Sequence, residues 1–269
     1  MGVAVPPRRP QAGRVGVILG TLLDLVLPSG CAGCGAAGGG VCPACAAELC
    51  RPPSVRRPRP APSGLPVCLS AGDYDGAIRE LILAYKERGR RSLAAPLGDT
   101  LAAVVCAGWP GPEPVVLIPV PATAAAIRAR HGDHMLRLAK RAVRCLRTGG
   151  RPAAVATPLR ARPKADSAHL DREQRAVSAR TAFAIRTHWR DGQRLAALRS
   201  LADGGAVVLV DDVLTTGSTL AAVAGALLDV GVPVAFAVTL AATRLRAPLS
   251  NPARASEASA RHTLWADPI

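Results

Sequence analysis

The sequence has few aromatic residues, with three Trp, two Tyr and two Phe among its 269 residues. This scarcity argues against a protein that recognises nucleic acid by stacking bases on aromatic side chains. No apolar run approaches the ~18–20 residues that a membrane-spanning helix needs, so we expect no membrane insertion. The GxxxxGK[ST] motif is also absent, and with it the phosphate-binding loop of common nucleotide hydrolases.

Lysine is scarce as well, because only Lys86, Lys140 and Lys164 are lysines among the 34 basic residues. The formal net charge is +15, and residues 128–199 are especially rich in arginine. Residues 204–230 contain three aspartates and no basic residue. A basic middle next to an acidic segment suggests phosphorylated ligands or nucleic acid, although arginine-rich solvated surfaces would explain it equally well.

The N-terminal residues resemble a signal peptide only superficially. An apolar stretch at residues 15–27 follows three arginines and precedes Cys31. Asp24 and Pro28 argue against export, since a charge interrupts the stretch and a proline stands close to the cysteine. The stretch is more typical of an amphipathic helix that ends at Pro28. We therefore expect a cytoplasmic protein, in which cysteines more often bind metal than form disulfides.

Five of the eight cysteines follow within a short segment. Cys31 and Cys34 form one CxxC pair, and Cys42 and Cys45 form a second. Two such pairs favour a tetrahedral zinc site, and a complete set of four thiolates makes the metal structural. The seven-residue gap is short for a zinc ribbon, and Cys50 is a fifth candidate ligand, so it could replace one of the four.

The next segment, residues 51–66, contains six prolines and four arginines. Such a composition disfavours a helix or a central strand and indicates a stiff linker. Beyond it, strand and helix patterns alternate, which is typical of an α/β fold with a parallel sheet. Buried strands are expected at residues 115–120, 207–210 and 233–240, and helices at residues 74–86, 93–106, 133–147 and 219–230.

Residues 207–220 carry the most informative pattern. A buried strand leads into Asp211 and Asp212, and a loop of small hydroxyl residues with one glycine opens a helix. Free N–H groups at a helix N-terminus bind phosphate, while adjacent carboxylates accept hydrogen bonds from a vicinal diol or hold Mg2+. Together these features describe a site for a ribose 5-phosphate. The loop residues are Thr215, Thr216, Gly217, Ser218 and Thr219.

This segment is similar to the signature of the type I phosphoribosyltransferases, whose donor is phosphoribosyl pyrophosphate (PRPP). From about Leu22 to Thr243 the chain resembles one branch of that superfamily, the ComF family of competence-associated proteins. The likeness rests on the paired cysteines, the helix at 74–86, the turn Pro119-Val120-Pro121, the run Leu159-Arg160-x-Arg162, Arg175, Ala182-Phe183 and the signature at 207–220.

The resemblance implies a type I phosphoribosyltransferase fold with a small N-terminal zinc-ribbon-like domain. It also implies that Asp211 and Asp212 are the catalytic acids and that Mg2+ accompanies PRPP. The expected PRPP-binding residues are these two acids, the loop Thr215, Thr216, Gly217, Ser218 and Thr219, the turn residues Val120 and Pro121 within 119–124, and Arg160 and Arg162 in a loop at about 158–170.

Two positions depart from the family pattern. The stretch Arg130-His131-Gly132-Asp133-His134 stands where the family has Arg-Gly-Phe-Asn, and Ser178 stands where it has Asn. An acid–base cluster of His131, Asp133 and His134 is conceivable, but we interpret these residues as a solvent-facing helix start.

Three functions remain open: a PRPP-dependent transferase with an unknown acceptor, a non-catalytic PRPP- or nucleotide-sensing module linked to DNA uptake and competence proteins, and an accessory protein that binds single-stranded DNA. The expected organisation is an N-terminal tail and helix (1–30), a zinc knuckle (31–50), a Pro/Arg-rich linker (51–66), a phosphoribosyltransferase-like domain (67–243) and a polar tail (244–269).

Overall fold

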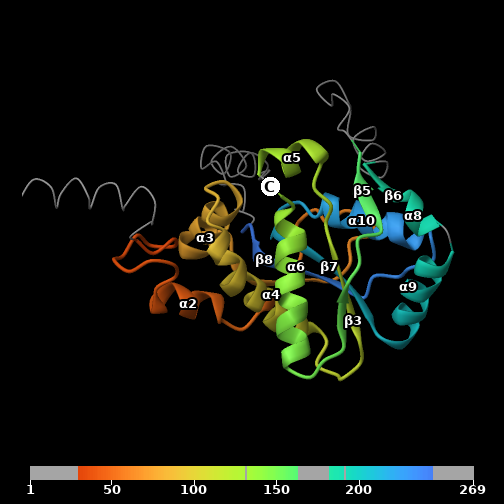
Figure 1. The fold of residues 1–269 in the computed structure, drawn as a ribbon, viewed down its shortest axis with the longest axis horizontal. Coiled ribbons are helices and arrows are strands. Elements are labelled where there is room, and N and C mark those ends of the chain that lie inside the picture. The colour runs from red at the N-terminus through yellow and green to blue at the C-terminus, as the bar shows by residue number, and fades with distance from the viewer. Residues whose placement is uncertain (1–29, 131, 163–181, 191, 245–269) are drawn as a thin grey trace, which may run out of the picture.

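The computed structural model describes residues 30–130, 132–162, 182–190 and 192–244. The amphipathic helix expected before Pro28, Arg175, Ser178 and nearly all of the polar tail lie outside these residues. A six-stranded sheet forms the centre of the described structure, with helices on both faces (Figure 1). This arrangement confirms the α/β fold class.

The sheet has the strand order β1-β2-β8-β7-β3-β4. The five strands from β2 to β4 are parallel, and β1 pairs antiparallel with β2 at one edge. The strands are β1 (Ser54–Arg56), β2 (Cys68–Asp73), β3 (Val115–Pro119), β4 (Ala153–Val155), β7 (Ala206–Leu214) and β8 (Phe236–Ala242). A separate hairpin joins β5 (Leu159–Ala161) to β6 (Phe183–Ile185).

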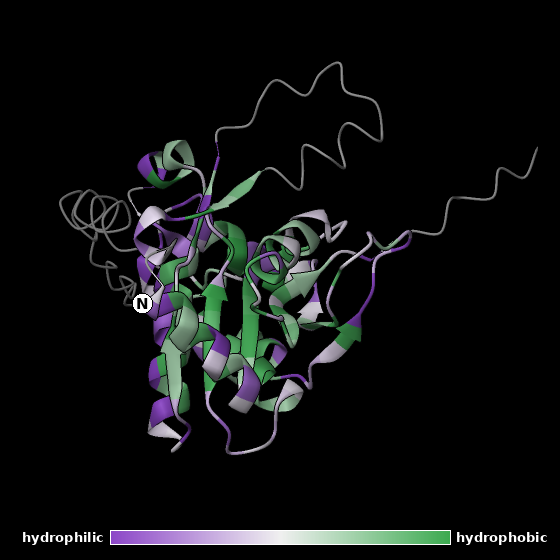
Figure 2. Ribbon diagram, turned by 90° about the vertical axis from the view of Figure 1, so that its right-hand side faces the viewer, coloured by the Kyte–Doolittle hydropathy of each residue, from purple (hydrophilic) through white to green (hydrophobic). Residues whose placement is uncertain are grey.

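Two hydrophobic clusters cover the two faces of the sheet, and the central strands are the most apolar part of the fold (Figure 2). Successive strand residues alternate between faces. Val208 and Val210 accordingly join one cluster, and Val207 and Leu209 join the other. On the first face lie α2 (Pro43–Leu49), α3 (Gly76–Lys86), η1 (Arg91–Leu93), α4 (Ala94–Gly108) and α6 (His134–Thr148), and on the second lie α9 (Gln193–Gly204) and α10 (Ser218–Leu228).

Two short helices complete the described elements: α5 (Ala124–Ala129), which follows β3, and α8 (Thr187–Arg190), which precedes α9. None of the described helices is both long and apolar enough to cross a membrane.

The cysteine segment packs directly on the main body of the fold. Cys45 and Leu49 of α2 are buried in the same cluster as residues of α3 and α4. The guanidinium of Arg90 donates a hydrogen bond to the Gly30 carbonyl, 3.1 Å away. The knuckle therefore shares its hydrophobic core with the sheet.

The proline-rich segment also packs on the sheet. It contributes β1 at the sheet edge, a position that tolerates neighbouring prolines because one side of the strand is unpaired. Further along, Pro58 and Leu65 lie against Gly217 at the start of α10. The segment thus runs from the cysteine knuckle to the loop in which phosphate binding is expected.

Candidate ligand-binding site at the carboxyl ends of the strands

The acidic pair lies at the carboxyl end of the sheet, beside the end of β3. Pro119 pairs with Val210, and the Val120 N–H donates to the Val210 carbonyl at 2.9 Å. The turn that includes Val120 and Pro121 is therefore next to Asp211 and its neighbour. Ligands of open parallel sheets bind beyond the carboxyl ends of the strands, so this position suits a binding site.

β7 is longer than the run of apolar residues that predicts it. The expected strand covers 207–210, but the structure continues it through both aspartates to Leu214. The register with β8 explains the extension, since Asp211 pairs with Thr239 and Leu214 with Ala242. Backbone pairing holds the acidic residues in the sheet, and this fixes their position more firmly than a loop would.

The loop after β7 has the features of an anion-binding turn. Gly217 adopts φ +77° and is the N-cap of α10, with no side chain capping the helix. Of the first-turn N–H groups of α10, that of Ser218 donates to Thr216 Oγ1 at 3.4 Å, and the described contacts give no side-chain partner to those of Thr219 and Leu220. The Thr216 and Ser218 hydroxyls lie 3.1 Å apart, and both residues are exposed, as are Thr215 and Thr219.

Asp212 is held by two basic side chains from the first face of the sheet. Lys86 Nζ donates to Asp212 Oδ2 at 2.5 Å, and His134 Nε2 lies 3.5 Å from the same oxygen. Burial raises the pKa of Asp212, but the His134 hydrogen bond and the Lys86 charge outweigh it and lower the pKa to about 2. Asp212 therefore stays ionised throughout the physiological range.

Asp211 has a different environment and a different pKa. Its Oδ1 accepts a hydrogen bond from the Asp212 N–H at 2.9 Å. Burial, followed by the negative charge of Asp212, raises the pKa of Asp211 to about 7. The pKa values of the two adjacent acids therefore differ strongly, as expected for two carboxyl groups at one site.

The structure corrects our interpretation of the stretch before α6. Asp133 does begin a helix, because its carboxylate accepts a hydrogen bond from the Leu136 N–H at 2.9 Å. His134, however, is buried and faces Asp212, so the expectation of a solvent-facing helix start is wrong for this residue. His131 lies outside the described residues.

The sequence did not single out Lys86, and it led us to interpret His134 as solvent-facing rather than as a partner of Asp212. Lys86 is the last residue of α3, and His134 is the first residue of α6. A lone histidine or a lysine at a helix end carries no signal by itself. Only the packing of these two helix ends beside β7 brings the residues to Asp212.

Arg160 and Arg162 occupy a different place from the acidic pair. Arg160 is exposed on β5, and the Arg162 N–H donates to the Ala182 carbonyl across the hairpin. The hairpin packs through β6 against α10, the helix that follows the hydroxyl loop. Among the described contacts, none joins either arginine to Asp211 or Asp212, and residues 163–181 lie outside the description.

The four predicted cysteines form one cluster. The sulfurs of Cys31, Cys34, Cys42 and Cys45 lie within 4.8 Å of one another, so they could hold a metal ion such as zinc, and Cys50 is not part of the group. The sequence had left the choice between Cys50 and the others open.

The surroundings of the cysteine cluster fit a metal site. Burial raises the pKa of Cys31, but backbone N–H groups, first that of Cys42 at 3.2 Å, outweigh it and lower the pKa to about 6. Burial and hydrogen bonds from the neighbouring cysteines raise the pKa of Cys45. A divalent cation would stabilise all four as thiolates at once. A Cβ on Gly33 would lie 2.8 Å from the Cys45 sulfur, so only glycine lets the backbone come this close to that sulfur.

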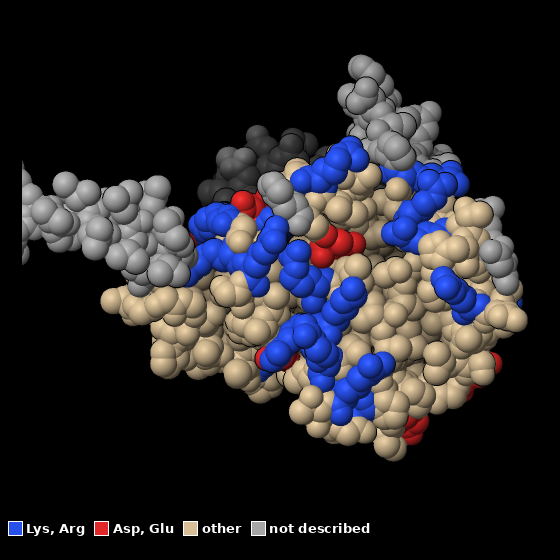
Figure 3. Space-filling view, viewed as in Figure 1, with Lys and Arg blue, Asp and Glu red and all other residues tan. Residues whose placement is uncertain are grey.

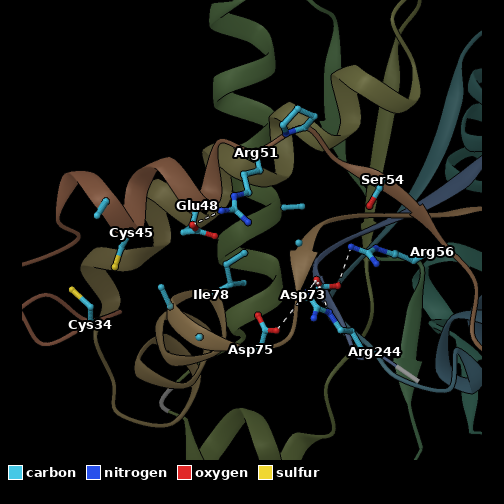
Figure 4. A pocket seen from close by; sticks show the side chains of 16 residues that line it. Cys34, Cys45, Glu48, Arg51, Ser54, Arg56, Asp73, Asp75, Ile78 and Arg244 are labelled. Carbon is cyan, nitrogen blue, oxygen red and sulfur yellow. Dashed lines mark hydrogen bonds and ion pairs between the residues drawn. The ribbon is translucent and has the colours of Figure 1, made fainter. Parts of the chain in front are cut away.

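A pocket of about 500 Å³ lies between the cysteine knuckle and the sheet edge (Figure 4). Its polar side chains largely pair with one another. Asp73 contacts Arg56 at 3.0 Å and Arg244 at 2.5 Å, and Glu48 contacts Arg51 at 2.7 Å. The two Asp73 pairs connect β1, the end of β2 and the chain after β8, so we interpret the lining as a structural clasp.

Comparison with known families finds a domain model that is similar to the part of the chain containing the acidic pair. Residues 139–259 match the model of the phosphoribosyl transferase domain. The match supports the type I phosphoribosyltransferase superfamily. No curated protein matches the sequence. The phosphoribosyl transferase match contains β7, the hydroxyl loop and α10, whereas Lys86, His134 and the cysteines precede it. The finer resemblance to the ComF family remains a prediction.

Proposed function

We propose that the chain binds PRPP, or a closely related ribose 5-phosphate ester, at the carboxyl ends of β3 and β7. The observation that carries the proposal is the arrangement at the end of β7, where a short hydroxyl-rich loop leads from two adjacent carboxylates to the N-terminus of α10. The N–H groups and hydroxyls of the loop would take the 5-phosphate, and the carboxylates would accept hydrogen bonds from the ribose hydroxyls.

The reaction that such a site supports is transfer of the phosphoribosyl group. An acceptor nucleophile attacks C1 of the ribose, the bond from C1 to the pyrophosphate oxygen breaks, and the nucleophile's proton is released. Mg2+ bound with PRPP would neutralise the departing pyrophosphate, and Asp211 and Asp212 would orient the ribose. The resemblance to ComF proteins adds the hypothesis that this activity serves DNA uptake. A site that binds PRPP without turnover would make the protein a nucleotide sensor.

Calorimetric titration of the full chain with PRPP and Mg2+ tests the proposal. The wild-type protein should bind, and the Asp211→Asn, Asp212→Asn double variant should lose most of the affinity. Replacement of Asp229, an acid at the far end of α10, by Asn is the matched control and should leave binding intact. Equal affinity in the double variant would refute the proposal. Pyrophosphate release in the presence of candidate acceptors then separates a transferase from a sensor.

We also propose that the cysteine cluster holds structural zinc. Four thiolates fill a tetrahedral coordination sphere and leave no position for substrate, so the metal would stabilise the knuckle and its packing on α3 and α4.

A second candidate function is the binding of single-stranded nucleic acid. Basic side chains gather in a band across α3 and α6 (Figure 3), and exposed members on α6 are Lys140, Arg144 and Arg147. With few aromatic residues in the chain, such a band would contact phosphates rather than stack bases. The affinity of a single-stranded oligonucleotide should then fall steeply with salt and weaken in Lys140→Glu, Arg144→Glu, but not in Arg194→Glu on the opposite face. Weak binding without salt dependence would exclude this function.

A further inference from the structure

We propose that Lys86 and His134 are positioning residues that make Asp212 select a ribose over a 2-deoxyribose. This inference rests on the proposed function and deepens it. Both residues lie outside the range that matches the phosphoribosyl transferase domain, at the end of α3 and the start of α6. Asp212 lies on β7, within that range.

The geometry of the contacts determines which oxygen of Asp212 remains for a ligand. Lys86 Nζ and His134 Nε2 both approach Oδ2, at 2.5 and 3.5 Å. Neither contact goes to Oδ1. Two partners on one oxygen fix the rotation of the carboxyl group, so Oδ1 keeps one direction relative to Asp211.

Burial makes this fixed oxygen selective. The Asp212 side chain is 10% exposed and the His134 side chain 9% exposed, so the carboxylate exchanges few hydrogen bonds with water. An ionised carboxylate can only accept, and it therefore requires a donor such as a ribose hydroxyl. A 2-deoxyribose lacks one of the two adjacent hydroxyls and leaves a buried acceptor without a partner. Sites that hydrogen-bond a substrate hydroxyl reject the analogue lacking it for this reason.

The position of His134 beside Asp212 leaves one of its ring nitrogens without a hydrogen bond. Its Nδ1 is buried without a hydrogen-bond partner, and the Tyr85 hydroxyl donates to its carbonyl oxygen at 3.0 Å. With Nε2 directed at Asp212, Nδ1 is left buried without a hydrogen-bond partner. A buried polar atom without a partner calls for an explanation, and orientation of Asp212 supplies one.

Lys86 adds a charge that a phosphorylated ligand needs. Its side chain is 26% exposed, so the ammonium remains at the surface of the site while it contacts Asp212. Two adjacent carboxylates alone would repel the phosphate groups of a ribose ester. The lysine charge offsets this repulsion, and its contact with Oδ2 keeps the carboxylate ionised and oriented.

The test compares the affinities of the full chain for ribose 5-phosphate, 2-deoxyribose 5-phosphate and inorganic phosphate by calorimetry. We expect the wild-type protein to prefer the ribose by about tenfold or more, the factor set by one hydrogen bond to a charged group. In Lys86→Met and His134→Phe this preference should fall toward onefold. The affinity for inorganic phosphate should stay unchanged in His134→Phe and should fall in Lys86→Met, which also removes a positive charge. Arg194→Met, at an exposed position of α9 on the opposite face of the sheet, is the matched control and should keep the wild-type preference.

Conservative variants separate positioning from a merely structural role. Lys86→Arg and His134→Gln retain a donor to Asp212 and should keep most of the preference, whereas loss of fold would reduce all three affinities together. If Lys86→Met does not fold, the contrast between His134→Phe and His134→Gln decides, and an equal preference in those two variants overturns the inference. A wild-type chain that binds both sugar phosphates equally overturns the inference alone, and one that binds neither these nor PRPP overturns the proposed function with it.

Discussion

Leu65 packs against Gly217, so the proline-rich segment touches the middle residue of the loop expected to bind phosphate. A Cβ atom on Gly217 would lie 2.9 Å from Leu65 Cδ2 and 3.3 Å from Pro58 Cγ. Gly217 also has φ +77°, a conformation that residues with a side chain rarely adopt. Two independent constraints thus require glycine at this position.

Replacement of Gly217 by Ala should lower the free energy of unfolding by about 1–2 kcal/mol from the backbone conformation alone, with an added cost from the clash. Thermal and denaturant unfolding would measure the loss. Gly225→Ala is the matched control, because this glycine lies inside α10 with open space around it and the change should be neutral or stabilising.

The Leu65→Ala, Gly217→Ala double variant tests the contact itself. Leu65→Ala removes the clash but not the backbone strain, so the double variant should be more stable than the sum of the two single effects predicts. Strict additivity would show that the proline-rich segment moves away from the new side chain without loss of stability. The contact between Leu65 and Gly217 would then not constrain the loop.

Loss of one metal ligand should separate the four clustered cysteines from Cys50. Cys34 and Cys50 are both exposed, so replacement by Ala removes little packing at either site. Cys34→Ala should abolish zinc binding, measured by mass spectrometry of the native protein, and lower the midpoint of thermal unfolding, since metal binding contributes directly to folding. Cys50→Ala should retain one zinc per chain. The reverse pattern would assign Cys50 to the site.

The raised pKa of Asp211 predicts a pH dependence of stability. An isolated aspartate titrates near 3.8, and Asp211 in the folded chain titrates at about 7. Between these values the folded state binds more protons than the unfolded state, so this group stabilises the fold at low pH and its contribution is lost as the pH rises through 7. Asp211→Asn removes the effect.

Denaturant unfolding of both proteins between pH 5 and 8 measures this contribution. The stability of the variant relative to wild type should rise with pH, by up to about 1.4 kcal/mol per pH unit for one proton. A parallel pH profile for the two proteins would show that Asp211 is already ionised at pH 5.

The ion pairs of Asp73 should contribute more to stability than those of its neighbour Asp75. The Asp73 side chain is 17% exposed and contacts both Arg56 and Arg244, whereas the Asp75 side chain is 65% exposed and lies 3.9 Å from Arg244. We expect Asp73→Asn to lower the free energy of unfolding by about 1–3 kcal/mol, and Asp75→Asn to change it by less than about 0.5 kcal/mol. Similar effects from both variants would show that the clasp around the pocket is no stronger than an exposed ion pair.

Local patterns in the sequence predicted the α/β class, three of the five parallel strands and the two cysteine pairs. A buried parallel strand reads as a continuous apolar run, and this predicted the centres of β3, β7 and β8. The spacing of the two CxxC pairs predicted a cysteine cluster, and the structure decided that its members are Cys31, Cys34, Cys42 and Cys45 without Cys50. Shorter elements such as β1 and β4 were missed because three residues carry too little periodicity.

The partners of Asp212 could be decided only by the tertiary structure. Lys86 and His134 are 126 and 78 positions away from it, and no local pattern relates residues at such separations. The ends of α3 and α6 meet beside β7 because their apolar faces pack in one cluster on the sheet. The sequence determined which chemical groups the strand end presents. Long-range packing decided which side chains surround these carboxylates and so determine their pKa values. The neighbours of a buried carboxylate come from whichever elements cover it.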